Sequence, residues 1–493
     1  MQTRARALVW FRKDLRLRDN PALESALANG KEIIPVFIWN EEEGRRWRPG
    51  AASRWWLHQA LKSLADSIKN LGGCLVLDKG RAEELLPLLA KENGADELLY
   101  SRAYDPAGLT TQEAVEEAFD NAGIRTESFN ASLLNEPWEI QNSSGKPFQV
   151  FTPYWRRSRN GIYKKPATYP ANKLIFSEKP TPRSSLDELG LLPEHQWHEK
   201  LFMHWDVSEV AGQAQIAHSA REIVPSYANR RNSPGIDGTS RLSPYLAWGL
   251  ISPRQVCHAV LQTEPEGSNR GENKFLAEIG WREFSYHLLY HFPRIPDQPL
   301  RPKYAKFPWL SDSHALSDWK YGRTGYPIVD AGMRQLYETG WMHNRVRMVV
   351  ASFLVKHLLI SWEEGARWFW DTLVDADLAS NTQGWQWAAG CGADAAPYFR
   401  IFNPITQGEK FDSKGHYSRH WIPSLKAIPD KWLYRPCEAP TEILQEHSIE
   451  LGVDYPKPCV DHPEARARAL LALSSLRRSF EEREKDYCVY TCY

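Results

Sequence analysis

Short apolar runs alternate with helical patterns over residues 1–135, and this alternation restricts the fold of that part of the chain. The runs are rich in β-branched and aromatic residues, as buried strands are, and helical periodicities lie between them. The candidate strands are residues 7–11, 33–39, 74–77, 97–100 and 124–129. Strands separated by helices pair in parallel through right-handed crossovers. We therefore predict a doubly wound α/β domain over residues 1–135.

The first predicted helix of this domain has clear end signals. Asn20 is a good N-cap, Pro21 occupies the first helical position, and Gly30 follows the last turn. A doubly wound sheet binds ligands beyond the carboxyl ends of its strands. No G-x-G-x-x-G motif follows the first strand, so a dinucleotide is not supported there, although another small molecule fits the same crevice.

The pattern changes twice further along the chain. Residues 136–205 contain a Pro-rich irregular stretch and are predicted to form a connector. Helical periodicities replace strand patterns from residue 206 to the end, for example over residues 273–291, 328–339 and 344–357. We therefore predict a second, all-helical domain over residues 206–493, so that the fold class is α/β plus all-α.

Composition restricts the function further. Lys plus Arg and Asp plus Glu number 61 each, so any nucleic-acid surface has to be local. No apolar run approaches the about 20 residues of a membrane span, and the basic N-terminus lacks the apolar segment of an export signal. Cys488 and Cys492 lie close together but lack the partner pair of a metal site. We expect a monomeric, cytoplasmic protein without a metal ion.

Several stretches of the chain carry side chains suited to binding. Thr239, Ser240 and Ser243 surround a predicted helix start, where hydroxyl and backbone N–H groups would cradle a pyrophosphate. An ordinary helix cap is the alternative. The basic run Arg156, Arg157 and Arg159, together with Arg230 and Arg231, would form a local DNA patch, or a solvated or interdomain charge cluster.

A predicted helix places Glu278, Trp281 and Arg282 on one face, at positions i, i+3 and i+4. A carboxylate, an indole and a guanidinium on one face suit a pocket in which Arg pairs with a phosphate and Trp stacks on a base. The Glu would hydrogen-bond or protonate an oxygen of the ligand. An exposed amphipathic face with a Glu–Arg pair is the alternative.

A later helix places Asn344, Arg347 and Met348 on one face in the same way. Asp375 and Asp377 are candidates to pair with Arg347 or to hold a ribose hydroxyl. Buried charge pairs cost desolvation, so their retention often reflects a ligand.

Ordered blocks over nearly the whole chain resemble the photolyase/cryptochrome family. The blocks are residues 10–20, 238–243, 281–284, 325–331, 341–348, 384–387, 398–404 and 406–411. The resemblance is strongest to bacterial photolyases of cyclobutane pyrimidine dimers, including the class III branch related to plant cryptochromes. It implies an N-terminal antenna domain, a C-terminal domain that holds FAD, and light-driven repair of damaged DNA by electron transfer from excited, reduced FAD.

The resemblance also assigns residues to the FAD. The expected FAD-binding residues are Tyr227, Thr239, Ser240, Arg241, Leu242, Ser243, Arg282, Arg347, Asp375, Asp377 and Asn381. Trp385, Trp362 and Trp309 match the family's electron relay to the flavin. This gives a role to some of the 21 tryptophans, most of which we expect in the helical core.

A second set is implied for the lesion and the DNA. The expected contacts are Arg231, Glu278, Trp281, Asn344, Arg345, Met348, Trp387 and Gln407, and the expected catalytic residues are Glu278, Asn344, Met348 and Asn381. The pattern of (6-4) photolyases has histidines at positions 344 and 348, where this chain has Asn344 and Met348. Plant-type cryptochromes usually have Asp at position 381, where this chain has Asn381. A blue-light photoreceptor without repair activity is the main alternative. An electron-transfer flavoprotein or a plain DNA-binding module is the alternative from another class.

The antenna chromophore is less well defined by the sequence. Residues 100–106 resemble family members that carry either a folate or a deazaflavin, but the Asn-Glu pair that grips folate in one branch is absent. The Trp55–Trp56 pair and residues 134–137 resemble a branch that binds methenyltetrahydrofolate through a Glu. We therefore expect methenyltetrahydrofolate rather than deazaflavin, with Glu136 as a contact. A solvated loop acid is the alternative for Glu136.

Overall fold

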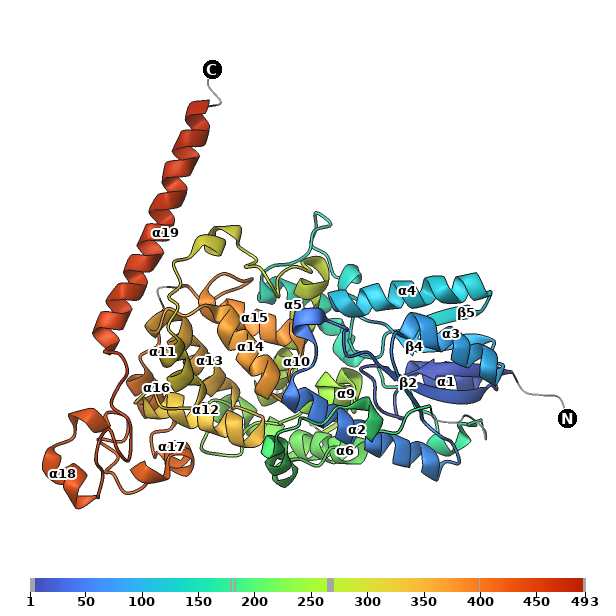
Figure 1. Cartoon of the computed structure of the whole chain (residues 1–493), viewed down its shortest axis with the longest axis horizontal. Helices are drawn as coiled ribbons and strands as arrows, with labels where there is room; N and C mark the ends of the chain where they lie inside the picture. The colour runs from blue at the N-terminus through green and yellow to red at the C-terminus, as the bar shows by residue number, and fades with distance from the viewer. Residues whose placement is uncertain (1–4, 178–179, 181–182, 264–269, 399, 491–493) are drawn as a thin grey trace. The chain divides into compact units, whose positions relative to one another are not determined.

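Five parallel strands form a sheet in the first part of the chain, in the order β3-β2-β1-β4-β5 (Figure 1). The strands are β1 (Arg6–Trp10), β2 (Glu32–Trp39), β3 (Val76–Lys79), β4 (Glu97–Ser101) and β5 (Arg125–Phe129). Every predicted strand is present, with ends displaced by no more than two residues. The prediction of a parallel, doubly wound sheet is confirmed.

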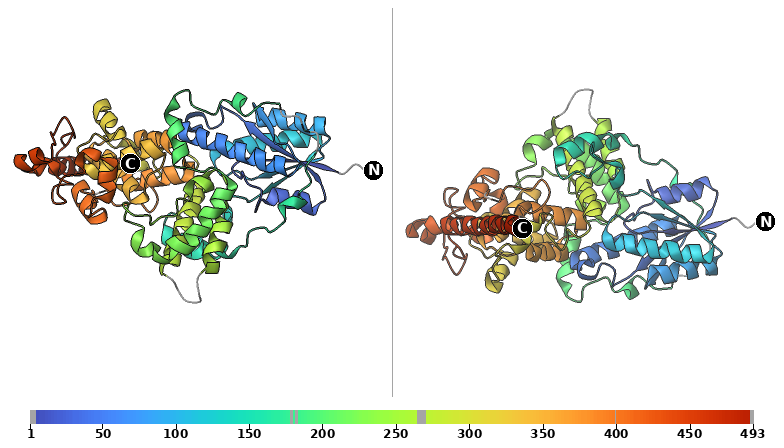
Figure 2. Two further views of the ribbon diagram at one scale, coloured as in Figure 1. Left: turned by 90° about the horizontal axis from the view of Figure 1, so that it is seen from below. Right: turned by 90° about the horizontal axis from the view of Figure 1, so that it is seen from above.

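Helices cover both faces of this sheet (Figure 2). The helices between the strands are α1 (Pro21–Ala28), α2 (Ala51–Asn70), α3 (Ala82–Asn93) and α4 (Pro106–Ala122). Leu8 and Trp10 of β1 point to the same face and share one buried core with Leu86 of α3 and Phe119 of α4. Ala7 and Val9, which alternate with them, are also fully buried. Burial of both faces explains why the strands are almost continuously apolar.

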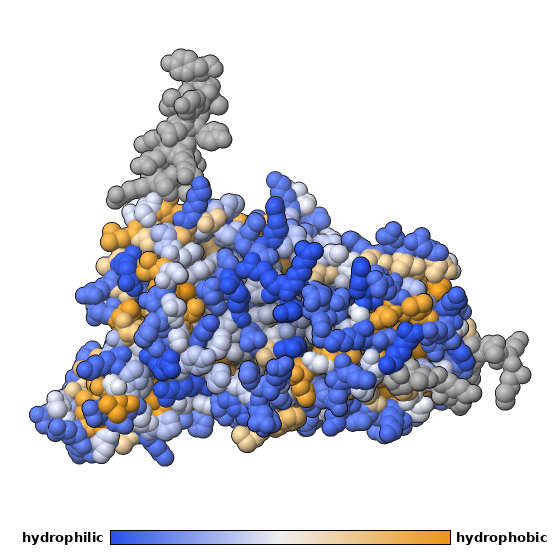
Figure 3. All heavy atoms as spheres, in the orientation of Figure 1, coloured by the Kyte–Doolittle hydropathy of each residue, from blue (hydrophilic) through white to orange (hydrophobic). Residues whose placement is uncertain are grey.

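The computed structural model describes residues 5–177, 180, 183–263, 270–398 and 400–490, and of residues 477–490 only the backbone. They form two compact units. Unit 1 comprises Met1–Ala228, Ser240–Pro293 and Trp370–Ala379, and unit 2 comprises Asn229–Thr239, Arg294–Phe369 and Ser380–Tyr493. Unit 1 therefore contains the sheet, the connector and a helical segment. The face of the molecule in Figure 3 is mostly hydrophilic, with apolar side chains in small clusters.

The part of the chain after the sheet is helical. Up to residue 293 the helices are α5 (Phe151–Ser158), α6 (Glu209–His218), α7 (Tyr227–Arg230), α8 (Ser243–Ala247), α9 (Pro253–Thr263) and α10 (Arg270–His291). Among the described residues that follow Phe129, β-pairing is limited to isolated bridges. The predicted helix over residues 273–291 is therefore present as α10.

The later helices are α11 (Ser313–Lys320), α12 (Pro327–Thr339), α13 (Asn344–Ser352), α14 (Trp362–Thr372), α15 (Leu378–Ala389), α16 (Pro404–Phe411), α17 (His416–Trp421), α18 (Thr441–Glu446) and α19 (His462–Tyr490). The helix predicted over residues 344–357 is α-helical only to Ser352, after which a π-helical turn covers Phe353–His357. All five residues of this π-turn are buried, so the run of buried positions extends past the end of the α-helix and gives no signal for the change in backbone hydrogen bonding.

The loop after β1 joins the sheet to the helical segment of unit 1. Arg16 is fully buried, and its guanidinium donates hydrogen bonds to the carbonyl oxygens of Asp19 at 2.7 Å, Ala131 at 2.8 Å and Gly249 at 2.9 Å. Burial lowers the pKa of Arg16, against the pull of nearby carboxylates. A buried guanidinium is tolerated only when its donors are satisfied, so Arg16 requires all of these carbonyl groups.

A short strap segment, Trp370–Ala379, also belongs to unit 1. The Nε1–H of Trp370 donates to the carbonyl oxygen of Arg48 at 2.7 Å, and Asp371 Oδ1 accepts from the backbone N–H of Ala51 at 2.9 Å. Asp371 therefore binds the start of α2, where a carboxylate is favoured by the helix dipole. The strap carries Asp375 and Asp377, two of the predicted site residues.

Gly249 provides a test of the joint between the loop and the helices. Its φ is +68°, and a Cβ atom there would lie 2.1 Å from the carbonyl oxygen of Lys13. Gly123 has the same φ of +68° with no atom within 4 Å of the added Cβ, so it is a matched control. We expect G123A to cost about 1–2 kcal/mol from backbone strain and G249A at least about 3 kcal/mol. Thermal unfolding monitored by circular dichroism measures both, and equal losses would contradict the close approach.

Candidate functional site

The part of the predicted phosphate cradle that belongs to unit 1, Ser240–Ser243, is a turn that ends at the short helix α8. Arg241 has a φ of +48°, in the left-handed region, and is exposed. The Ser243 hydroxyl donates to Asp375 Oδ2 at 2.6 Å, and the Ser240 carbonyl oxygen accepts from Gln215 Nε2 at 2.8 Å. Leu242 is buried beneath the turn. A non-glycine residue in this strained conformation marks a backbone that the surrounding fold holds in place.

Asp377 lies among charged and aromatic groups of unit 1. The Tyr286 hydroxyl donates to Asp377 Oδ2. The Asp377 carboxylate, with that of Asp105, raises the pKa of Lys13 against the effect of burial. Lys13 Nζ lies 3.1 Å from Asp105 Oδ2, at the start of α4. Asp377 thus acts on a lysine that follows β1 and pairs with the start of α4, near the edge where a doubly wound sheet binds ligands.

Helix α10 presents Glu278, Trp281 and Arg282 as predicted, and all three are half-buried. The Arg282 guanidinium donates to the carbonyl oxygen of Ser132 at 2.8 Å and lies 4.8 Å from the ring centroid of Tyr286. Arg282 therefore connects α10 with the loop at Ser132. It also packs on Tyr286, the residue of α10 that donates to Asp377. Tyr227, also in unit 1, is buried against Phe275 of α10, with ring centroids 5.1 Å apart.

Glu283, next to Arg282, was not predicted from the sequence as a site residue. Its buried carboxylate accepts hydrogen bonds from the backbone N–H groups of Leu134 at 2.8 Å and Asn135 at 3.3 Å. Burial raises the pKa of Glu283 to about 7, although Arg282 and the two N–H groups favour the charged form. Since its partners lie about 150 residues away, no local pattern reveals this role.

In unit 2, Arg345 connects three segments that carry predicted DNA contacts. Its guanidinium donates to Asn232 Oδ1 at 2.8 Å and lies 4.5 Å from the ring centroid of Phe411. Asn232 follows Arg231, and Phe411 lies one helical turn after Gln407 on α16. Arg345 therefore contacts the two segments that carry Arg231 and Gln407.

The other residues of α13 differ in exposure. Asn344 begins the helix and is exposed, whereas Met348 and Arg347 are half-buried. Arg347 Nε donates to the carbonyl oxygen of Met342 at 2.8 Å. The pairing of Arg347 with Asp375 stays a prediction. Thr239 is half-buried in the segment Asn229–Thr239 of unit 2.

Helix α15 carries Asn381, Trp385 and Trp387 in unit 2. The buried Asn381 side chain donates from Nδ2 to the carbonyl oxygen of Ala366 at 3.0 Å. Trp385 is buried with its ring 6.0 Å from Trp319 and 5.0 Å from Phe369, while Trp387 is half-buried. Trp319 was not singled out from the sequence, because nothing in its local pattern distinguishes it from a core tryptophan.

The other two tryptophans predicted for the relay lie on adjacent segments of unit 2. Trp362 is buried at the start of α14, and Trp309 is half-buried. The backbone N–H of Leu310 donates to the carbonyl oxygen of Leu359 at 2.8 Å. The segment that carries Trp309 therefore lies beside the residues that precede α14.

Glu136 is buried and already paired, unlike a solvated loop acid. Its carboxylate accepts from the Arg102 guanidinium, and from the Tyr104 hydroxyl at 2.9 Å. Burial raises the pKa of Glu136, against the pull of Arg102. Trp138, 37% exposed, lies beside this pair, with its ring 5.5 Å from the Arg102 guanidinium and 5.4 Å from the ring of Tyr290.

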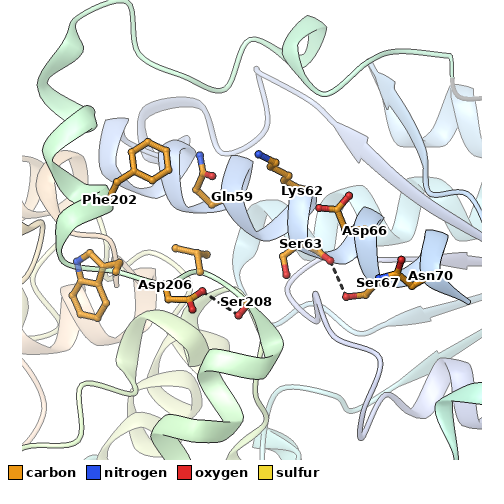
Figure 4. Close-up of a pocket in the computed structure, with 11 residues that line it drawn as sticks. Gln59, Lys62, Ser63, Asp66, Ser67, Asn70, Phe202, Asp206 and Ser208 are labelled. Carbon is orange, nitrogen blue, oxygen red and sulfur yellow. Dashed lines mark hydrogen bonds between the residues drawn. The ribbon is translucent and has the colours of Figure 1, made fainter.

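An open cleft of about 470 Å³ lies elsewhere in unit 1 (Figure 4). Its lining residues are Gln59, Lys62, Ser63, Asp66, Ser67 and Asn70 of α2, with Phe202, Trp205, Asp206, Val207 and Ser208. None of the predicted site residues is among them. The rings of Trp55 and Trp56 pack behind the cleft, with centroids 5.2 Å from Phe202 and 5.5 Å from Trp205, respectively.

The described residues contain neither a metal-binding cluster nor a membrane-spanning helix. They contain no group of three or more His, Cys, Asp or Glu side chains that would hold a metal ion. The Cys488 side chain and Cys492 lie outside the described residues. No helix in the described part of the chain has the length and apolar character of a membrane span.

Comparison with known proteins gives consistent results for both parts of the chain. The sequence model described as DNA photolyase matches residues 7–171, and the model described as FAD binding domain of DNA photolyase matches residues 275–475. These matches, with the parallel sheet and the helical part, define the two-part architecture of a DNA photolyase. The predicted fold class is confirmed.

Whole-chain relatives extend the match. A deoxyribodipyrimidine photo-lyase of Agrobacterium fabrum is 44% identical over 477 residues, covering 96% of this chain and 99% of the relative. Cryptochrome-1 of Arabidopsis thaliana is 38% identical over 482 residues, covering 95% of this chain and 70% of the relative. The crystal structure of a bacterial class III photolyase from Agrobacterium tumefaciens has a TM-score of 0.93 and 43% identity, covering 97% of this chain and 99% of that one. The chain belongs to the photolyase and cryptochrome family.

The buried Glu283 carboxyl group predicts a pH-dependent stability. Its pKa in the folded protein, about 7, lies above the ordinary value of 4.5, so the folded state disfavours the charged form. Wild-type stability should therefore fall, relative to E283Q, as the pH rises from about 4.5 through 7. At pH 8 we expect E283Q to be more stable by about 3 kcal/mol, and at pH 4 we expect little difference.

Thermal unfolding of the two proteins at pH 4, 6.5 and 8 measures this difference. E113Q, at an exposed position of α4, controls for the loss of one negative charge. A difference between wild type and E283Q that stays constant with pH would show that Glu283 is not destabilised as an anion.

Proposed function

We propose that this protein is a deoxyribodipyrimidine photo-lyase that repairs cyclobutane pyrimidine dimers in DNA under blue light. The observation that carries the proposal is the 44% identity, over 96% of the chain, to a deoxyribodipyrimidine photo-lyase. Asn344 and Met348 stand at the positions where the pattern of (6-4) photolyases has histidines. Asn381 stands where plant-type cryptochromes usually have Asp.

The donor set fits FAD chemically. The turn at Ser240–Ser243 offers hydroxyl and backbone N–H groups for a pyrophosphate, and Asp375 and Asp377 offer acceptors for ribose and isoalloxazine donors. We assign FAD binding to Tyr227, Thr239, Ser240, Arg241, Leu242, Ser243, Arg282, Arg347, Asp375, Asp377 and Asn381. When bound and reduced, FAD supplies the photoexcited electron that splits the dimer and then returns.

The residues of the chain bind and orient the lesion. Trp281 and Trp387 stack on the flipped bases, while Glu278 hydrogen-bonds a thymine carbonyl oxygen on which negative charge develops. We also assign Asn344, Arg345 and Met348 to the lesion, and Arg231 and Gln407 to the DNA backbone. A damaged base pair is already weakened, so flipping costs less at a lesion, which favours damaged over intact DNA.

We further propose that residues 1–135 form the antenna domain, 136–205 the connector and 206–493 the FAD- and DNA-binding domain. We propose a monomer that acts in the bacterial cytoplasm. Sedimentation of the protein with and without a dimer-containing oligonucleotide tests the oligomeric state, and a dimer in both cases would contradict it.

For the antenna we propose methenyltetrahydrofolate, with Glu136 as a contact. A buried carboxylate suits the N–H donors of a pterin ring, and the exposed Trp138 beside it offers a stacking surface. The absorption spectrum of the purified protein and of its E136Q variant tests this. Loss of a folate absorption band in E136Q alone supports the contact, and an unchanged band contradicts it.

Repair itself is tested with reduced protein, a thymine-dimer oligonucleotide and blue light. We expect restored thymines with wild type, and E278A to lower the quantum yield by at least about tenfold while dark binding falls less. E113A, at the exposed position of α4, should equal wild type. A flavin-containing protein that restores no thymine would favour a blue-light photoreceptor, and a protein without flavin would refute both.

The tryptophan relay predicts a separate effect on the oxidised flavin. W385F should abolish photoreduction of oxidised protein by an external reductant, because a phenyl ring is much harder to oxidise than an indole. Repair by chemically pre-reduced W385F should remain near the wild-type level. W421F, in α17, is the matched control. Unchanged photoreduction in W385F would remove Trp385 from the relay.

A further inference from the structure

The connector helix α5 lies flat against α10 through three aromatic rings. Phe151, the first residue of α5, stacks on Trp281 with ring centroids 3.8 Å apart and planes 8° apart. Trp155, one turn later, is nearly parallel to Phe151, with a centroid distance of 6.2 Å and an angle of 11°. A Cβ atom on Gly280 would lie 2.5 Å from the Trp155 ring, so the lack of a side chain there permits this approach.

The stack fixes the orientation of the Trp281 indole. Phe151 is buried and covers one face of the indole. Phe284 contacts both rings edge-on, at 5.9 Å from Trp281 and 6.0 Å from Phe151. Rotation of Trp281 would separate it from Phe151 and Phe284 together. Trp281 nevertheless remains half-buried rather than buried, so part of the residue is accessible at the surface.

We propose that Phe151 is a positioning residue for lesion recognition, and that α5 is therefore part of the lesion-binding site. This inference rests on the proposed function, in which a flipped pyrimidine stacks on Trp281. A base that stacks on the open part of Trp281 extends an existing row of parallel rings. The indole is already oriented, so binding does not have to immobilise it, which is equivalent to about two- to tenfold in affinity.

The same helix presents positive charge. Arg156 and Arg157 follow Trp155 on α5, and Arg159 follows its last residue; all three are exposed. Exposed arginines next to an aromatic stack are the combination that holds a nucleic-acid backbone while a base stacks. These charges serve damaged and intact DNA alike, whereas the ring stack serves only a base that has left the duplex.

The effect of Phe151 should therefore appear as a loss of lesion preference. We expect F151L to weaken dark binding of an oligonucleotide with one thymine dimer by about three- to tenfold. Binding of the same oligonucleotide without damage should change by less than about twofold, because phosphate contacts dominate it. In repair assays the KM for the dimer should rise while kcat at saturating substrate is retained. F151Y should restore the wild-type preference.

Fluorescence anisotropy with both oligonucleotides measures these affinities. F148L is the matched control, because Phe148 contacts Tyr154 and His287, at 6.3 and 6.5 Å, rather than stacking on Trp281. The inference is overturned if F151L keeps the wild-type ratio of damaged to undamaged affinity, or if F148L or F151Y loses as much. F151M replaces F151L if the latter does not fold. Wild type without any preference for the dimer would instead overturn the proposed function itself.

Discussion

The buried guanidinium of Arg16 is the interaction on which the arrangement of unit 1 depends. A charge without exposed surface is stable only if its donors find acceptors, and those of Arg16 are carbonyl groups near positions 19, 131 and 249. The loop after β1, the segment after β5 and the helical segment that contains Gly249 must therefore meet at one point. The turn at Ser240–Ser243 lies a few residues before Gly249, whose carbonyl oxygen accepts from Arg16. The position of the turn therefore follows from the need to satisfy the Arg16 guanidinium.

Helix α10 then distributes the site over its length. Its Glu283 holds the 134–135 backbone, its Arg282 reaches Ser132, and its Tyr286 donates to Asp377. The connector helix α5 packs on the same element through Phe151. A single helix thus contacts the loop at residues 132–135, the connector and the strap. These contacts give the half-buried Glu278, Trp281 and Arg282 of α10 a defined orientation.

Local signals predicted the fold well. The strands follow from short apolar runs, and the start of α1 follows from Asn20 and Pro21, because both signals act within a few residues. The binding residues were assigned mainly by resemblance, since their spacing alone left ordinary caps and ion pairs as alternatives. Glu283, Tyr286 and Phe151 were missed because their partners lie 90 to 150 residues away or on another helix. The π-turn after α13 was missed because all of its residues are buried, so the run of buried positions continues through it.

The strap segment imposes an order on biosynthesis. A ribosome releases the sheet, α2 and the connector long before Trp370 and Asp371 exist, yet these two residues bind the Arg48 carbonyl and the start of α2. The segment from Arg48 to the start of α2 therefore waits, with that part of its surface uncovered, until some 320 further residues have been translated. An N-terminal fragment that stops before the strap is consequently an incomplete folding unit, whatever its own sheet contributes, and the cell must protect it for the duration of translation.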